Sequence, residues 1–531
     1  MPSLIIDHQS IEAKPGETVL QAARAAGLEI PTLCYLQGHE AGASCMVCAV
    51  KLKHSGQFIP ACASRAVEGM ELEHDTPEVR EVRRMAIELL LSDHLGDCLS
   101  PCQRICPAHL GIPAVLQHLR DGDFGTAAAV ARRDLALAGI LCRICHRPCE
   151  QGCRRNLHDD AVAIAELVVH AIDTELAAGE PRLPFHAPAE APGRVAIIGA
   201  GFTGLGAAWF LQQQGIPCTV IDENPAPAAS IRAAFADLPP GLIAAEVRLL
   251  ERAGVAFRTS TRIDGMEALD ALTREFGAVL LATGPAAHEQ AGALGLATDG
   301  LRLAADKLTM MSSRAGVFVA GRAVRPGGQP VNSVADGKAV ALCIGQYLTQ
   351  QPVLRPAKPF SIFMGKVLAG EMPDFLLDAS AAARSEPGAL AGDIGRAIEE
   401  SKRCVHCNCS KAAVCQLRQL AATYQVNPHR FNSGERMRFQ RNVEHPWVCF
   451  EAGKCIRCGN CIHVAGTYRD ALGLTFIGRG FDVHLAVPFH ASMQEGMLES
   501  ARAVVAACPT GALTLRDVSD ASDASDGAAR Q

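Results

Sequence analysis

The sequence has no excess of positive charge: its 50 lysines and arginines are outnumbered by 56 aspartates and glutamates, for a formal net charge of −6. A nucleic-acid-binding protein usually carries a basic patch or stripe, and this composition argues against one. No apolar run reaches about 18 residues, so no membrane-spanning helix is predicted. Residues 1–10 resemble neither a signal peptide nor a twin-arginine leader.

The sequence also lacks a recognisable acid/base pair, nucleophile elbow, phosphate-binding loop or molybdenum-type domain. It does contain 22 cysteines. In a long chain without a signal peptide, so many thiols favour metal or cluster ligation over disulfides. The chain is therefore predicted to work in a reducing cytoplasm.

One stretch carries a nucleotide-binding pattern. An apolar run at 195–198 leads into Gly199-x-Gly201-x-x-Gly204, then into a helix-like segment and a second apolar run that ends at Asp222. Such glycines let the backbone approach a pyrophosphate at a helix N-terminus, and an acid about 20 residues on binds a ribose hydroxyl. The full context predicts a Rossmann-type α/β domain with a bound dinucleotide.

The first 78 residues read as a hairpin and a short helix followed by four thiols: Cys34, Cys45, Cys48 and Cys62. Two irons need four thiolates, and a loop with a CxxC pair can wrap them, so a [2Fe–2S] domain is predicted over 1–78. A zinc site is the alternative. The cysteine order resembles plant-type ferredoxins. The longer gaps resemble the N-terminal domain of the large iron–sulfur subunit of complex I, and of related iron hydrogenases and formate dehydrogenases, which implies a β-grasp ferredoxin fold.

The helix expected after this domain ends near His94, four residues before Cys98. In the complex I subunit the corresponding helix ends in a histidine followed, after three residues, by a cysteine. The resemblance implies that His94 is a cluster ligand. The alternative is a polar residue at a helix end.

Residues 79–180 are predicted to form a helical domain with two groups of thiols, because gaps of three residues put successive thiols about one helical turn apart. The groups are Cys98, Cys102 and Cys106, and then Cys142, Cys145, Cys149 and Cys153. They resemble the N-terminal domain of the glutamate synthase small subunit and of dihydropyrimidine dehydrogenase, in which two interlocked groups hold two [4Fe–4S] cubanes. Zinc or purely structural thiols are the alternative.

This resemblance is incomplete at two positions. It places a Glu or Gln ligand at Val168, a side chain that cannot bind iron. It also leaves the first family cysteine unmatched, unless Cys142 or His94 replaces it. Two cubanes are expected, one of them incomplete or unusually ligated.

Three landmarks after the glycine turn resemble the FAD domain of the glutamate synthase small subunit. They are an ATG ending at Gly284, a GVFVAGR ending in Gly321 and Arg322, and a segment containing Asp336. The resemblance implies that these residues and the glycine turn bind FAD within 193–350. Arg322 replaces the family's aspartate and could pair with the pyrophosphate. A flavin fold retained only as a scaffold is the alternative.

The family's NADPH domain is expected to be absent. It should lie between the first two landmarks, but only residues 285–315 separate them, and no second GxGxxG occurs there.

Cluster motifs resume after a connector at 351–400. Residues 401–445 resemble the complex I segment that binds a cluster through one histidine and three cysteines, and Cys409 could replace the histidine. A CxxCxxC with a remote Cys-Pro in 446–515 predicts one [4Fe–4S] cluster in a ferredoxin-like domain. The two sets are Cys404, Cys407, Cys409 and Cys415, and then Cys455, Cys458, Cys461 and Cys508.

The remaining thiols, Cys218, Cys343 and Cys449, are predicted to be buried and structural. Residues 516–531 are predicted to be a disordered tail.

Together these patterns predict a multi-domain α+β and α/β protein with one [2Fe–2S] cluster, about four [4Fe–4S] clusters and FAD. The predicted function is electron transfer in a soluble multi-subunit oxidoreductase of the NAD-linked formate dehydrogenase, hydrogenase or transhydrogenase type. Its expected partners resemble complex I's NADH-oxidising flavoprotein, or a formate dehydrogenase or hydrogenase chain. One alternative is a self-contained NAD(P)H- or ferredoxin-dependent oxidoreductase resembling the glutamate synthase small subunit. The other is an assembly scaffold.

Overall fold

The computed structural model describes residues 1–179, 181–185, 191–432, 434 and 436–516. The chain divides into two compact units, each discontinuous in sequence. Unit 1 comprises Met1–Ser100, Pro359–Leu377 and the residues from His406 onward; unit 2 comprises Pro101–Lys358 and Asp378–Val405. The predicted tail at 516–531 lies, apart from Arg516, outside the described residues.

Unit 1 begins with a mixed five-stranded sheet in the order β2-β1-β5-β3-β4. Strand β1 pairs parallel with β5, and the other neighbours pair antiparallel. Leu4 and Ile6 alternate along β1 and are buried with Leu20 of α1, the helix that the Thr18–Gln21 capping box begins. The elements are β1 Ser3–Ile6, β2 Gln9–Glu12, α1 Val19–Ala25, β3 Ala49–Leu52, β4 Phe58–Pro60 and β5 Met70–Glu73.

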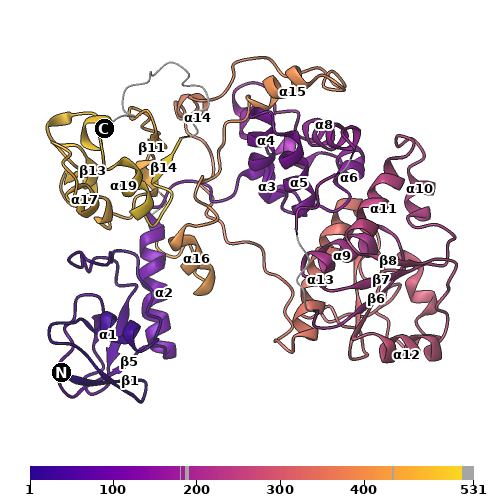
Figure 1. Ribbon diagram of the computed structural model, residues 1–531, viewed down its shortest axis with the longest axis horizontal. Helices are drawn as coiled ribbons and strands as arrows, with labels where there is room; N and C mark the ends of the chain where they lie inside the picture. The colour runs from indigo at the N-terminus through magenta and orange to yellow at the C-terminus, as the bar shows by residue number, and fades with distance from the viewer. Residues whose placement is uncertain (180, 186–190, 433, 435, 517–531) are drawn as a thin grey trace. The chain divides into compact units, whose positions relative to one another are not determined.

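Helix α2 (Pro77–Ser92) leads out of this sheet and is bound by a segment from much later in the sequence. The side chain of Thr76 caps α2, and a proline occupies its first turn. Helix α16 (Gln416–Thr423) packs against α2, as Figure 1 shows. The buried carboxylate of Glu88 accepts a hydrogen bond from the Asn427 amide at 2.9 Å and pairs with Arg430 at 2.9 Å.

The last part of unit 1 pairs β11 antiparallel with β14, and β12 antiparallel with β13. Helices α17 and α19 pack against each other, and Val464 and Val504 from them share one buried cluster with Leu513. The elements are β11 Val448–Phe450, α17 Asn460–Ala465, β12 Thr475–Ile477, β13 His484–Ala486, α18 Met493–Gly496, α19 Ala501–Ala507 and β14 Leu513–Leu515. Helix α14 (Met372–Leu376) also belongs to unit 1.

Unit 2 begins with a helical bundle in which α5 packs on α4 and α8, and α6 on α8. Helix α15, from the returning segment, packs on α4 and α8. The helices are α3 Pro101–Ile105, α4 Ile112–Arg120, α5 Phe124–Asp134, α6 Ala138–Ile144, α7 Pro148–Gln151, α8 Ile164–Ala177 and α15 Ile394–Ser401.

The rest of unit 2 is a parallel sheet in the order β10-β9-β6-β7-β8. Helix α13 packs closely along α9, where a Cβ on Gly337 would stand 2.6 Å from the Thr203 carbonyl oxygen. The strands are β6 Val195–Ile198, β7 Cys218–Ile221, β8 Ala256–Arg258, β9 Ala278–Leu281 and β10 Val317–Val319. The helices are α9 Phe202–Gln213, α10 Ala229–Ala234, α11 Leu242–Arg252, α12 Met266–Glu275 and α13 Pro330–Leu348.

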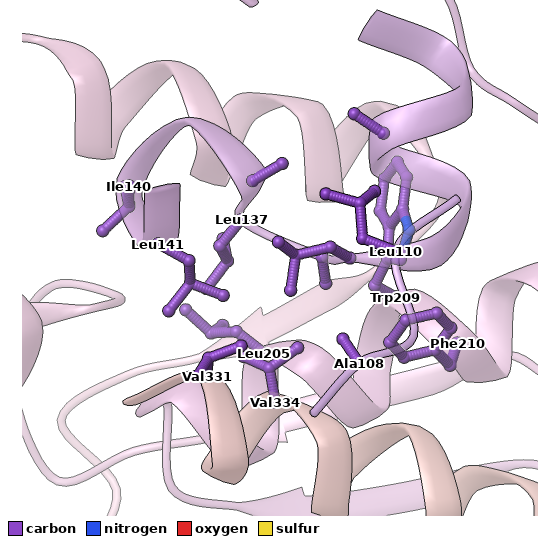
Figure 2. Packing of buried hydrophobic residues seen from close by; sticks show 14 of the residues in the cluster. Ala108, Leu110, Leu137, Ile140, Leu141, Leu205, Trp209, Phe210, Val331 and Val334 are labelled. Carbon is purple, nitrogen blue, oxygen red and sulfur yellow. The ribbon is translucent and has the colours of Figure 1, made fainter. Parts of the chain in front are cut away.

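One hydrophobic core joins the helical bundle of unit 2 to its sheet. Figure 2 shows Leu137 and Leu141 of the bundle facing Leu205 of α9 and Val331 of α13. The Trp209 indole nitrogen donates to the Arg132 carbonyl at 2.8 Å, which satisfies both buried groups. The bundle and the sheet are therefore packed as one body.

We expect Leu205→Ala to destabilise unit 2 by about 2–5 kcal/mol, because it removes a fully buried side chain at this junction. A lower thermal midpoint followed by near-ultraviolet circular dichroism would show it. The matched control is Leu301→Ala, whose side chain is 75% exposed and whose loss should change the stability by less than about 0.5 kcal/mol. Equal midpoints for the two variants would contradict the expectation.

The multi-domain α+β and α/β architecture predicted from the sequence is confirmed at that level, by the mixed sheet of unit 1 and the parallel sheet of unit 2. The two compact units cut across the predicted segments 79–180, 351–400 and 401–445. Of the described helices, none combines the length and the apolarity that crossing a bilayer requires.

Candidate cofactor sites

The four N-terminal cysteines, Cys34, Cys45, Cys48 and Cys62, are all buried and lie together in unit 1. Hydrogen bonds from the Cys45 and Cys62 thiols lower the pKa of Cys34, and a hydrogen bond from Cys62 lowers the pKa of Cys48 to about 7. The loop that carries the CxxC pair turns sharply, since Met46 has a positive φ of 55°. The four thiols thus form one connected group.

Another group of four thiols lines a small apolar cavity in the last part of unit 1: Cys455, Cys458, Cys461 and Cys508. Gly459, with φ +80°, begins α17 and turns the CxxCxxC loop around the cavity. Burial raises the pKa of the Cys458 thiol to about 12. Because iron binding requires the thiolate, a bound cluster would have to supply the charge that stabilises it.

Unit 1 also brings together residues from both sides of the inserted segment. Asp97 bridges to Asn408 in parallel register, and the Cys409 amide donates to the Cys98 carbonyl at 3.4 Å. Cys98 and Cys415 belong to the same buried cluster of side chains. Three thiols that the sequence spreads over two predicted domains, Cys98, Cys409 and Cys415, therefore share one site.

His94 follows α2 and stands four residues before Cys98 in the sequence. Its Nδ1 is buried and has no hydrogen-bond partner in the part of the chain that the structure describes. Burial, and then the charge of Lys454, lower the pKa of His94 to about 3, so the ring is neutral. Lys454 also acts electrostatically on Cys98 and Cys409. A buried, neutral imidazole nitrogen without a hydrogen-bond partner has the chemistry of a metal ligand.

The predicted set of Cys404, Cys407, Cys409 and Cys415 falls on both units. Cys404 belongs to unit 2, and the other three belong to unit 1. The sequence carries one signal for this different grouping, which is the spacing of the residues. His94 stands four residues before Cys98, and Cys415 stands six residues after Cys409.

In unit 2, Cys106, Cys142, Cys145 and Cys149 line one cavity, together with Val168. Burial raises the pKa of Cys142 and of Cys149, and each lies close enough to the other thiols of the cavity to be affected by their charge. Cys102, Cys153 and Cys404 are the other unit 2 thiols of the predicted cluster motifs, and they contact the same hydrophobic core.

Among the described residues, no group of three or more histidine, cysteine or carboxylate side chains is gathered closely enough for a single metal ion. Two of the thiol groups line cavities, one in each unit. Of the leftover cysteines, Cys218 and Cys343 are buried as predicted, and Cys449 in β11 is half-buried.

The glycine turn borders a large cleft, at the carboxyl ends of β6 and β7. A Cβ on Gly204 would stand 1.9 Å from the Gly199 carbonyl oxygen, and one on Gly199 would stand 2.6 Å from that of Ala282. Only glycine fits at either position. Gly201 precedes the first residue of α9, so the free backbone amides of that helix face the cleft.

Asp222 lines this cleft and accepts hydrogen bonds from the amides of Ala200, at 2.6 Å, and Asn224, at 2.9 Å. Gly284 and Arg322 line it as well. These residues provide an anion-binding helix terminus, a carboxylate for a ribose and a cation, and they fit a dinucleotide.

Three of the predicted FAD-binding residues lie outside the described lining of the cleft: Gly204, Gly321 and Asp336. Asp336 pairs with Arg325, and with Arg355 at 3.0 Å. Gly321 packs behind the lining, where a Cβ would stand 1.9 Å from Thr203 Oγ1.

The cleft and the thiol cavity of unit 2 share a wall. Pro330 and Ser333 of α13 line the cleft, whereas Val331, between them, lines the cavity of Cys106, Cys142, Cys145 and Cys149. The first turn of α13 therefore separates the two sites.

Three family models match the chain. They are a 2Fe-2S iron–sulfur cluster binding domain at residues 3–77, the dihydropyrimidine dehydrogenase domain II with a 4Fe-4S cluster at 95–180, and an FAD dependent oxidoreductase at 194–429. The combination of iron–sulfur domains with a flavin domain agrees with the resemblances found in the sequence.

Curated relatives match parts of the chain. The NADP(+)-dependent formate dehydrogenase subunit beta of Moorella thermoacetica is 33% identical over 37% of this chain and 31% of its own length. The NADPH-Fe(3+) oxidoreductase subunit beta of Geobacter sulfurreducens is 33% identical over 36% of this chain and 28% of its own. The NADH-ubiquinone oxidoreductase 75 kDa subunit of Reclinomonas americana is 34% identical over 18% of this chain and 14% of its own. The matches thus span less than a third of each relative.

Proposed function

We propose that the chain relays electrons between FAD and a series of iron–sulfur clusters, as one subunit of a multi-subunit oxidoreductase. Its domains are those of an iron–sulfur flavoprotein that transfers electrons. The observation that carries the proposal is the shared wall of α13 between the dinucleotide cleft and the four-thiol cavity. Bound FAD would exchange electron pairs with a donor and single electrons with a neighbouring cluster.

We infer a ligand set for each cluster from the thiols that lie together. Cys34, Cys45, Cys48 and Cys62 would hold a [2Fe–2S] cluster. His94, Cys98, Cys409 and Cys415 would hold one [4Fe–4S] cluster, and Cys455, Cys458, Cys461 and Cys508 another. Cys102, Cys153 and Cys404 are left for a further cubane of unit 2.

The partner chains would hold the sites at which the electron donor is oxidised and the final acceptor is reduced. The relatives named above are subunits of a formate dehydrogenase, an NADPH-Fe(3+) oxidoreductase and an NADH-ubiquinone oxidoreductase. Between the ATG landmark and β10, the described chain forms a short 3-10 helix (Pro285–Gln290) and loops, so it offers no second nucleotide fold there. We infer that NAD(P)H is oxidised on a partner.

Anaerobic purification of the chain tests this function. We expect extractable FAD, iron and acid-labile sulfide. We also expect NADH- and NADPH-dependent dye reduction at the background rate only, although the dithionite-reduced chain passes its electrons to the same dye. Rapid NAD(P)H oxidation by the isolated chain would favour a self-contained oxidoreductase. A purified chain that keeps its clusters but has no extractable flavin would favour a scaffold, and either result would overturn the proposal.

A further inference from the structure

The cavity of unit 2 gathers four thiols that lie in or next to three helices, α3, α6 and α7. Cys106 follows α3, Cys142 lies in α6, Cys145 ends α6 and Cys149 lies in α7. Cys142 and Cys145 are three residues apart, so they project from the same side of the last turn of α6. The Cys145 amide donates to the Leu141 carbonyl at 2.9 Å and holds that turn in place. All four sulfurs border the same space.

Apart from the four thiols, the cavity wall presents few groups that could bind iron. It is mainly apolar, and Val168 of α8, which is fully buried, forms part of it. Arg147 also lines the cavity, but its cationic side chain cannot donate electrons to iron. The thiols are therefore the electron-donating side chains that this wall presents.

Two carboxylates that adjoin lining residues in the sequence, Glu150 and Glu166, have other partners. Glu166 pairs with Arg147 at 3.2 Å and accepts from the Gly388 amide at 3.1 Å. Glu150 pairs with Arg384 at 2.6 Å and accepts from the Ala165 amide at 3.0 Å. Neither carboxylate is among the residues that line the cavity.

We propose that Cys106, Cys142, Cys145 and Cys149 hold one [4Fe–4S] cluster through four thiolates, with Cys142 as its fourth ligand. This inference rests on the proposed electron-transfer function. Each thiol would lose its proton to solvent as its sulfur binds iron. The cluster would stand next to the first turn of α13, on the side opposite to the dinucleotide cleft.

Four thiolates would give this cluster more negative charge than three thiolates and a neutral ligand. The structure places a cation beside it. Lys338 donates to the carbonyls of Ala108, at 3.2 Å, and Asp134, at 3.0 Å, and its ammonium group is close enough to Cys106 for their charges to interact. Net charge and nearby cations set the reduction potential of a cluster, so Lys338 would offset part of the added charge.

The test compares wild type, Cys142→Ala and Cys343→Ala after the same anaerobic reconstitution. Cys343 is a matched control, because it is a buried thiol of unit 2 that does not line the cavity. Iron and sulfide analysis and electron paramagnetic resonance are the readouts. We expect Cys142→Ala to lose about four irons per chain, or about one iron with the signal of an oxidised three-iron cluster, and Cys343→Ala to match wild type.

A Cys142→Ala chain with the iron content and spectrum of wild type would overturn the inference. If this variant does not fold, Cys142→Ser takes its place. Its hydroxyl should shift the potential and alter the spectrum of one [4Fe–4S] cluster, and an unchanged spectrum would overturn the inference as well. Failure of the proposed function is distinguishable, because it would appear in wild type as rapid NAD(P)H oxidation or as a lack of extractable flavin, whereas this test compares the iron content and spectra of the variants.

Discussion

Cys98→Ala, Cys409→Ala and the doubly substituted chain are each expected to lack one and the same [4Fe–4S] cluster. The Cys409 amide donates to the Cys98 carbonyl, and both thiols share a buried site with Cys415. Substitutions in one ligand set are not additive, because the first already removes the cluster. Iron analysis should therefore show a loss of about four irons per chain in all three variants.

The doubly substituted chain tests whether Cys98 and Cys409 bind one cluster or two different clusters. The sequence alone assigned Cys98 to the helical domain and Cys409 to the segment at 401–445. With that grouping the double variant would lose two clusters, about eight irons, and such a loss would contradict the site described in unit 1. Cys343→Ala again serves as the control that loses none.

Gly204→Ala is expected to yield a chain without FAD. The added methyl carbon would stand 1.9 Å from the Gly199 carbonyl oxygen, a backbone atom that cannot move aside without opening the turn. The amount of flavin released from the purified chain, measured by its fluorescence, should fall about tenfold or more below that of wild type, as a loss of about 1.4 kcal/mol or more in binding free energy would produce. The iron content of unit 1 should remain, since its thiols come from other segments of the chain.

Gly292→Ala is the control for this prediction. A Cβ at Gly292 would meet nothing within 4 Å, and the residue does not line the cleft. This variant should bind FAD as wild type does. Stoichiometric flavin in the Gly204→Ala chain would show that the cleft at the glycine turn is not the flavin site.

The features that the sequence predicted well are those whose residues are close together along the chain. The glycine turn at Gly199–Gly204 and the Cys455–Cys461 loop carry their geometry in their spacing, because a turn of a few residues has few conformations. The same is true of the first four thiols, which a single small sheet gathers.

The contacts that the sequence did not predict depend on packing between distant segments. Cys98 and Cys409 meet although both segments of unit 2 are inserted between them, and no local pattern specifies that the chain returns to unit 1. Asp336 was predicted to bind the cofactor, but the structure pairs it with Arg325 and Arg355, which are not conspicuous in the sequence. Whether Cys142 faces Val168 likewise depends on how α6 packs on α8.

Unit 1 is built from segments that lie far apart in the sequence. Its sites can therefore form only in a certain order while the chain is synthesised. A ribosome that adds about 5–20 residues per second completes Cys98 on the order of 15–60 s before Cys409 emerges. During that interval the N-terminal sheet and the thiol cavity of unit 2 can each form, because all of their residues have already been synthesised. The site that joins Cys98 to Cys409 and Cys415 cannot close yet. The cluster proposed for this site would therefore be among the last to be inserted, and a nascent chain released early would carry two of the proposed ligands, His94 and Cys98, without the others.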